Sequence, residues 1–132
     1  MTRTLALALA GLLLASCQTP PRRVDASLAP LQHVVLFTLH DPADAPELMR
    51  DSLALLEIPG VTTIVTGPHV DVGRSTVISD YHVGLVVGLQ SVAHYRGYLE
   101  HPIHDDLIAR WRPKFAAVRV IDFGVPADAA SP

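Results

Sequence analysis

Residues 81–89 alternate between bulky and small side chains, and this alternation constrains the fold more than any other feature of the chain. The odd-numbered positions are large and apolar or aromatic: Tyr81, Val83, Leu85, Val87 and Leu89. The even-numbered positions are His82, Gly84, Val86 and Gly88. Side chains point to opposite faces along a strand, so the segment predicts a strand whose bulky face packs against helices. The small face favours a partner sheet, and we therefore expect a homodimer.

Six further segments carry strand or helix patterns. Strands are predicted from β-branched and aromatic runs, and helices from apolar spacing and start signals. The strands are 32–39, 61–66 and 118–123, and the helices are 45–57, 91–100 and 102–112. Pro102 suits the first position of the last helix. The order β-α-β-β-α-α-β predicts an α+β domain with a ferredoxin-like, split βαβ arrangement.

The helix expected over residues 45–57 has its own start signal. Asp44 offers an N-cap and Glu47 follows three residues later, which is a capping-box arrangement. The apolar residues at helical spacing are Leu48, Met49, Leu53 and Leu56. We therefore expect an amphipathic helix that ends before Pro59.

The N-terminal segment is typical of an export signal. Residues 1–16 carry one positive charge, at Arg3, followed by an uncharged apolar run. That run is shorter than the roughly 20 apolar residues of a membrane-spanning helix and ends in small residues, as secretory signals do. The sequence LASC at residues 14–17 resembles the lipobox of bacterial lipoproteins, in which cleavage precedes the cysteine and a lipid is joined to its sulfur. Cys17 is the only cysteine, and the alternative is a buried free thiol.

These signals predict the domain organisation. We expect a lipoprotein signal peptide at 1–16, a proline-containing lipidated tether at 17–30, a folded domain at 31–124 and a disordered tail at 125–132. Lipidation of Cys17 would anchor the protein to a membrane without a spanning segment. Gln18 stands where an inner-membrane retention signal would have Asp. The expected location is therefore the bacterial cell envelope, in the outer membrane facing the periplasm.

Composition excludes several classes of function. The chain has 10 Lys and Arg against 13 Asp and Glu, a formal net charge of −3, so no basic surface points to nucleic acid. A single cysteine excludes an internal disulfide framework and a cysteine-based zinc site. No cofactor motif is present, and we expect no cofactor and no metal.

The segment from Tyr98 to His104, YLEHPIH, concentrates groups that can move protons. Its two imidazoles bracket a proline at a helix start, where unpaired N–H groups and the helix dipole disfavour a protonated ring. A neutral imidazole can act as a base and a neighbouring phenol can donate a proton, so Tyr98 and His104 are candidate catalytic residues. Two alternatives stay open. His101 caps the helix while the others pack as ordinary core residues, or His101, His104 and Asp105 bind a metal, for which spacing fixes no third ligand.

Four motifs in this order resemble the stress-responsive A/B barrel (Dabb) domain family. They are HVVLF at 33–37, IPGV at 58–61, Tyr98 with the following HPIH at 101–104, and Asp122-Phe123. The resemblance covers about residues 31–124. It implies a ferredoxin-like fold that dimerises, the two sheets closing into an α/β barrel.

The resemblance also implies a site. Most members of the family have no assigned activity, but one plant member closes a linear polyketide by aldol condensation with a Tyr/His pair in a pocket between sheet and helices. Residue by residue, that pair corresponds to Tyr98 and His104, and a second pocket histidine corresponds to His33, with Leu85 and Val87 among the wall positions. Together with Val35, Phe37 and His101, these last three residues make up the predicted ligand pocket.

Three functions are consistent with these features. We expect an envelope-anchored homodimer that binds an unidentified small molecule in its apolar pocket. One alternative is an acid–base enzyme of cyclase or lyase type, with His104 as base and Tyr98 as proton donor to a developing enolate oxygen. The other is a structural dimer without a ligand. The sequence leaves open whether the protein is an enzyme.

Overall fold

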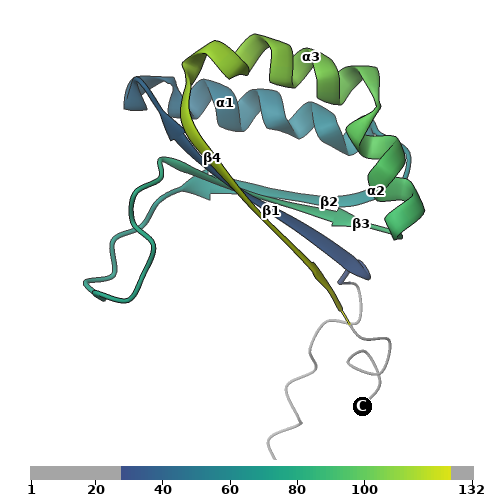
Figure 1. Cartoon of the computed structure of the whole chain (residues 1–132), viewed down its shortest axis with the longest axis horizontal. Helices are drawn as coiled ribbons and strands as arrows, with labels where there is room; N and C mark the ends of the chain where they lie inside the picture. Colours follow the sequence, from purple (N-terminus) through teal and green to yellow (C-terminus); the bar gives the residue numbers. More distant parts are fainter. Residues whose placement is uncertain (1–27, 126–132) are drawn as a thin grey trace, which may run out of the picture.

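A computed structural model describes residues 28–125, in which helices cover one face of a four-stranded antiparallel sheet (Figure 1). The strands are β1 (Leu31–Leu39), β2 (Val61–Pro68), β3 (Val83–Leu89) and β4 (Phe115–Gly124). The α-helices are α1 (Ala45–Ser52), α2 (Val92–Leu99) and α3 (Pro102–Trp111). Short 3-10 segments are η1 (Pro42–Asp44), η2 (Leu53–Glu57) and η3 (Arg112–Lys114). The element order is the predicted β-α-β-β-α-α-β.

Three sequence predictions lie outside the described residues. They are the signal peptide, the lipidation site Cys17 and nearly all of the two terminal segments expected to lack regular structure. None of the helices between residues 28 and 125 has the length and apolarity that spanning a bilayer requires.

The strands are arranged in the order β2-β3-β1-β4, so β1 has a partner on each side. Val35 of β1 pairs with Leu85 of β3 and with Val120 of β4. His33, two residues earlier, pairs with Val87 and with Asp122. Residues directly opposite in an antiparallel pair lie on one face, so these side chains all point to the helix side of the sheet.

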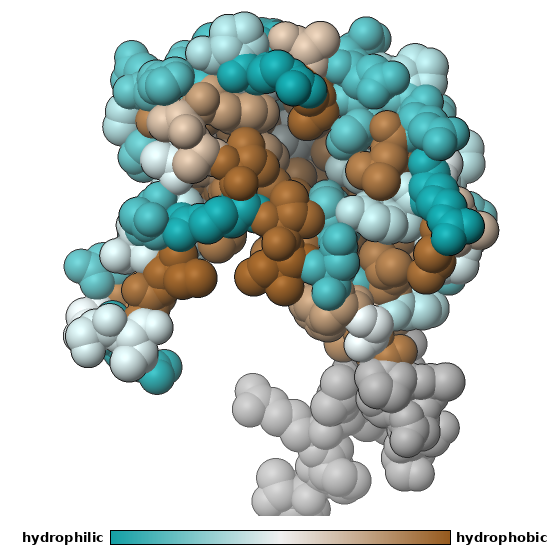
Figure 2. Space-filling view, in the orientation of Figure 1, coloured by the Kyte–Doolittle hydropathy of each residue, from teal (hydrophilic) through white to brown (hydrophobic). Residues whose placement is uncertain are grey.

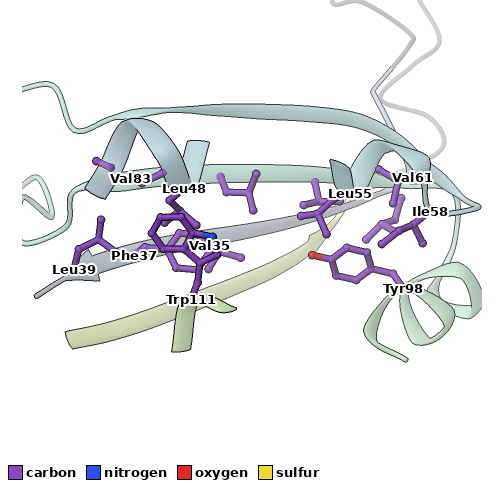
Figure 3. Close-up of a cluster of buried hydrophobic side chains, with 14 residues drawn as sticks. Val35, Phe37, Leu39, Leu48, Leu55, Ile58, Val61, Val83, Tyr98 and Trp111 are labelled. Atoms are coloured by element: carbon purple, nitrogen blue, oxygen red, sulfur yellow. The ribbon is translucent and has the colours of Figure 1, made fainter. Parts of the chain in front are cut away.

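The core lies between this face and the helices, as Figure 3 shows. The odd positions predicted for the bulky face of the third strand supply four core residues: Val83, Leu85, Val87 and Leu89. Leu48 of α1 and Trp111 of α3 are both fully buried. The Trp111 indole Nε1–H donates to the Asp51 carboxylate at 2.8 Å, which ties α3 to α1.

The first helix differs from the prediction in three ways. It ends at Ser52 and continues as η2 rather than as α-helix to residue 57. The predicted stripe is wrong in its second half: Leu53 and Leu56 are more than half exposed, and Leu55 is buried instead. A 3-10 turn has about three residues per turn rather than 3.6, so the buried side of the segment shifts by one position.

The capping box is also wrong. Asp44 makes no side-chain cap hydrogen bond, and its carboxylate accepts from the Lys114 Nζ at 2.9 Å instead. The capping residue is Asp41, whose side chain accepts from the backbone N–H of Ala43 at 2.9 Å. The chain therefore begins this helical region three residues earlier, with η1.

The second and third helices are separated at His101. Ser91 caps α2 by accepting from the backbone N–H of His94. His101 caps α3, since its Nδ1 accepts from the backbone N–H of Ile103 at 3.3 Å, and Pro102 occupies the first helical turn. His101 therefore makes the helix-cap contact that one of the sequence alternatives predicted. The break between the two helices lets α2 and α3 approach the sheet at different angles (Figure 1).

The face of the sheet away from the helices is more apolar than the sequence pattern suggests. One row across it consists of Val65, Val86, Val34 and Ile121. Val65 and Ile121 are 58% and 49% exposed. Gly88, by contrast, is buried, and a Cβ there would meet the Ala29 Cβ at 3.0 Å. The chain itself therefore covers the Gly88 end of this outer face, whereas Val65 and Ile121, at the two ends of the apolar row, are exposed and Val86 and Val34 between them are half-buried.

Candidate functional site

A cavity of about 490 Å³ lies between the helices and the helix side of the sheet. Its apolar walls come from β1, β3, β4, η2 and the last two helices and consist of Val35, Phe37, Leu55, Leu85, Leu99, Leu107, Ile108, Phe115, Ala117, Val118 and Val120. Five polar side chains complete the lining: His33, Tyr95, Tyr98, His104 and Arg112. Apolar side chains gather on the face that β4 crosses (Figure 2), which is where the cavity walls reach the surface.

Three of the polar side chains meet at one end of the cavity. The Tyr98 ring lies 4.7 Å from the His104 ring and 5.7 Å from the His33 ring, between centroids. Tyr98 is 2% exposed and His33 is 5% exposed. In Figure 3 Tyr98 extends from α2 with its hydroxyl over the sheet. β1, α2 and α3 therefore each place one proton-carrying group at the same point.

A carboxylate and a second phenol stand behind His33. The His33 Nδ1 lies 2.6 Å from the Asp122 Oδ1, and the Tyr95 hydroxyl donates to the Asp122 Oδ2 at 3.1 Å. An ionised carboxylate only accepts hydrogen bonds, so Nδ1 carries the hydrogen and Nε2 of a neutral His33 ring is left as an acceptor. Asp122 thus fixes both the orientation and the tautomer of His33.

Burial determines the protonation states at this end. It lowers the pKa of His104 below the usual value; Asp105 opposes this shift and the nearby His33 adds to it. Burial also raises the pKa of Tyr95 to about 12, with Asp122 acting in the same direction. The pKa of Tyr98 is raised as well, first by burial and then by Tyr95 and Asp122. At neutral pH the end of the cavity therefore offers a neutral His104 imidazole and two protonated phenols.

His104 has unused hydrogen-bonding capacity. Its Nδ1 is buried and has no hydrogen-bond partner among residues 28–125. The nearest carboxylate oxygen, Asp105 Oδ1, is 4.0 Å away, too far for a hydrogen bond. A buried polar atom without a partner costs stability, and such atoms are found where a ligand or water completes the network.

The structure brings together most of the residues predicted for the site. Tyr98, His104, His33, Val35, Phe37 and Leu85 all line the cavity. Two predicted residues do not line it. Val87 is fully buried in the core, and the His101 ring is turned to its cap hydrogen bond.

The predicted metal alternative is not assembled. Among the described residues, no group of three or more His, Cys, Asp or Glu side chains is arranged to hold a metal ion. The His101 Nδ1 is engaged with the backbone of Ile103. His104 and Asp105 alone would give a metal too few ligands.

Several residues of the site do not stand out in the sequence, Arg112 among them. Tyr95 is another, although it lies three residues before Tyr98 and so on the same side of α2. Asp122 entered only as part of a family motif, and its contact with His33 depends on the β1–β4 register. The sequence likewise does not indicate that Val118 and Val120 line a cavity, since their exposure depends on where the helices end.

Comparison with known proteins places the chain among ferredoxin-like domains. A family model described as Stress responsive A/B Barrel Domain matches residues 31–125. Among curated proteins, none matches the chain.

Three of the similar solved structures differ in what is known of them. A Dabb family protein with a ferredoxin-like fold from Mesorhizobium loti is 28% identical, with 73% of this chain and 95% of that one covered and a TM-score of 0.55. A dimeric ferredoxin-like protein of unknown function from Jannaschia sp. is 25% identical, with 72% and 98% covered and a TM-score of 0.56. Hydroxynitrile lyase from Passiflora edulis is 13% identical, with 73% and 93% covered and a TM-score of 0.63. The predicted ferredoxin-like α+β class is confirmed, and dimeric proteins occur among the structures that share it.

Proposed function

This chain belongs to the stress responsive A/B barrel domain family, and we propose that it is a homodimeric protein that binds a small, largely apolar molecule. One observation carries the proposal. A cavity of about 490 Å³ has apolar walls and a single end at which Tyr98, His104 and His33 converge. Ligand sites in proteins are typically concave, mostly apolar and of roughly 300–1,000 Å³, with a few polar groups that fix orientation.

The polar end recognises a group that both accepts and donates hydrogen bonds. Tyr98 can donate its O–H, and the Nε2 of a neutral His33 ring can accept, because Nδ1 is bound to Asp122. The unpartnered Nδ1 of His104 supplies a further position. A carbonyl or hydroxyl group on an apolar body fits this pattern.

The homodimer is supported by the outer face of the sheet. Val34, Val65, Val86 and Ile121 form an apolar row there. An exposed apolar sheet face favours packing against a second sheet. The Jannaschia relative is a dimeric ferredoxin-like protein. The second copy of this chain would leave the cavity free, because the cavity is on the other face.

The envelope anchor rests on the sequence. The apolar run in residues 1–16 ends at the lone cysteine, Cys17, and lipidation there would hold the domain at a membrane through acyl chains alone. With Gln18 as the next residue, the anchored domain would face the periplasm from the outer membrane. The Cys17→Ala variant tests this directly. It should neither incorporate a lipid label nor appear in the membrane fraction, and persistence of both would refute lipidation.

The closeness of the Tyr98 and His104 rings favours a second candidate function, acid–base catalysis. The neutral His104 would take a proton from the carbon next to a bound carbonyl. The electron pair of that C–H bond would form the enolate, whose oxygen accepts the Tyr98 hydrogen bond. Solvent deuterium should then enter a bound ketone probe such as 2-decanone. His104→Gln should slow this exchange by about 100-fold or more. An unchanged exchange rate would contradict catalysis by His104 and leave ligand binding as the only proposed function.

Mass spectrometry of small molecules retained by the purified protein tests the binding proposal. A chain of residues 18–132 is suitable, since it contains every described element and the whole buried core. Val118→Trp places a large ring in the cavity wall and should abolish retention. Val70→Trp adds the same ring to the exposed loop before β3, outside the cavity, and is the matched control. Identical spectra from the two variants would contradict the proposal.

A further inference from the structure

We infer that the ligand of this cavity is an amphipathic carboxylate, whose anionic group pairs with Arg112 and whose uncharged end lies between Tyr98 and His104. The inference rests on the proposed binding function and adds the class of ligand and its orientation. It follows from the charges at the two ends of the cavity. One end has the cation Arg112, which has no carboxylate partner among the described residues, and the other has the anion Asp122, which is already hydrogen-bonded to His33 and Tyr95.

Arg112 lies at the end of the cavity opposite to the one where Tyr98, His104 and His33 converge. It is the first residue of η3, which follows α3 and leads into β4. β4 begins beside the end of β1, where Phe115 pairs with Leu39, whereas His33 lies near the start of β1. His33 and Phe37 alone are four residues apart, which is roughly 13 Å at about 3.3 Å per residue. A ligand reaching both ends must therefore be elongated.

The Arg112 charge is unused within the described part of the chain. The neighbouring cations have carboxylate partners: Arg110 pairs with Glu47 and Lys114 with Asp44 at 2.9 Å. Arg112 pairs with no carboxylate of residues 28–125, although it lines the cavity. A guanidinium presents a planar fork of donors that matches a carboxylate in a two-point contact.

The other end would reject a carboxylate. Asp122 is there, hydrogen-bonded to His33 and Tyr95, and Asp105 lies 4.0 Å from the His104 Nδ1. His104 and Tyr98 are neutral near pH 7, since the pKa of His104 is lowered and the phenol of Tyr98 stays protonated. A second anion close to Asp122 would be repelled, and no lysine or arginine among the residues that line the cavity lies at this end to compensate.

The apolar stretch between the ends completes the preference. The walls there are Val35, Phe37, Val118, Val120, Leu107 and Ile108. An acyl chain lying against them gains from burial, at about 25 cal/mol per Å² of apolar surface. The charge difference between the ends then orients the chain, with the carboxylate outward at Arg112 and any oxygen substituent inward at Tyr98.

Calorimetric titration of residues 18–132 with decanoate and with decanol tests this inference. The two probes share an apolar chain and differ in charge, so decanoate should bind about fivefold to tenfold more tightly, the range expected for a partly exposed charge-assisted contact. Arg112→Gln should remove this advantage and leave decanol binding unchanged. Arg96→Gln is the matched control: Arg96 is an exposed arginine of α2 that does not line the cavity, and its loss should affect neither probe.

The outcomes separate this inference from the proposed function. Equal affinities for the two probes, or an Arg96→Gln loss as large as that of Arg112→Gln, would overturn the inference while small-molecule binding stands. Failure of both probes with a different molecule recovered by mass spectrometry would overturn it in the same way. Failure of both probes together with an empty mass spectrum would contradict the proposed function itself.

Discussion

Two halves of the same sheet face have opposite surroundings. Leu85, Val35 and Val120 form one row across β3, β1 and β4, and all three point to the helix side. Leu85 and Val35 are 2% and 5% exposed, but Val120 is 51% exposed. Neighbouring positions in one row, with similar side chains, are thus core on one side and open on the other.

The difference arises from where the helices lie. α1 packs on β2 and β3, and α2 packs on β3, whereas no described helix makes a comparable contact with β4. Yet β4 carries valines at its inward positions, as a covered strand would. Apolar residues without a covering element are typical of a surface that something else covers. The open half is therefore best understood as a site and the closed half as the scaffold that holds it.

The largest expected effect distinguishes the two faces of β4 itself. Val120 points to the cavity and Ile121 to the outer face, and the two are about equally exposed. Ile121→Arg should dissociate the proposed dimer, because burying an unpaired charge costs about 3 kcal/mol or more, roughly 100-fold in the dissociation constant. Val120→Arg should leave the dimer intact and block ligand retention. Analytical ultracentrifugation of both variants measures this, and equal effects on assembly would mean that the faces are misassigned.

A second comparison concerns the two helices above the sheet. Leu48 of α1 is fully buried in the closed half, while Leu107 of α3 is a partly buried wall of the cavity. Leu48→Ala should lower the free energy of unfolding by about 3 kcal/mol. Leu107→Ala should cost about 1 kcal/mol, since it enlarges a space that already exists. Urea unfolding at one protein concentration checks this, and comparable losses would show that both halves are equally packed.

The smallest effect is a pH dependence located at the open half. Because burial lowers the pKa of His104 in the folded protein, the unfolded chain binds the proton at higher pH. The stability that neutral His104 contributes is fully present above its unfolded pKa of about 6.5 and is lost as the pH falls through the lower folded pKa.

His104→Gln should therefore flatten the fall in stability between pH 7 and pH 5. His40→Gln, which changes an exposed histidine outside the cavity, serves as the control. If the free energy of unfolding falls equally with pH in the wild type and in the His104→Gln variant across this range, the pKa of His104 does not differ between the folded and unfolded states, which would contradict the prediction.

Much of the fold could be predicted because it depends on local patterns. The alternation at residues 81–89 placed Val83, Leu85 and Val87 in the core, where the structure has them. Pro102 and the helix break were visible for the same reason. The switch from α-helix to η2 was not, since Leu55 rather than Leu56 is buried only because of how the turn packs on the sheet.

The site could be predicted only in part. Tyr98 and His104 are six residues apart around a recognisable helix start, so their meeting has a local cause. The contact of Asp122 with His33 spans 89 residues and is created by strand register. The cation at the far end, Arg112, enters the cavity through the position of η3, which no local pattern specifies.

Methyl-detected NMR during a titration with decanoate tests the central claim that the open half is a ligand site. The methyl groups of Val118, Val120 and Leu107 should shift together and saturate at one affinity. The methyl groups of Val34 and Val65, on the outer face of the same sheet, should remain unchanged. Shifts confined to the outer face, or shifts at the cavity that persist in the Val118→Trp variant, would contradict the account.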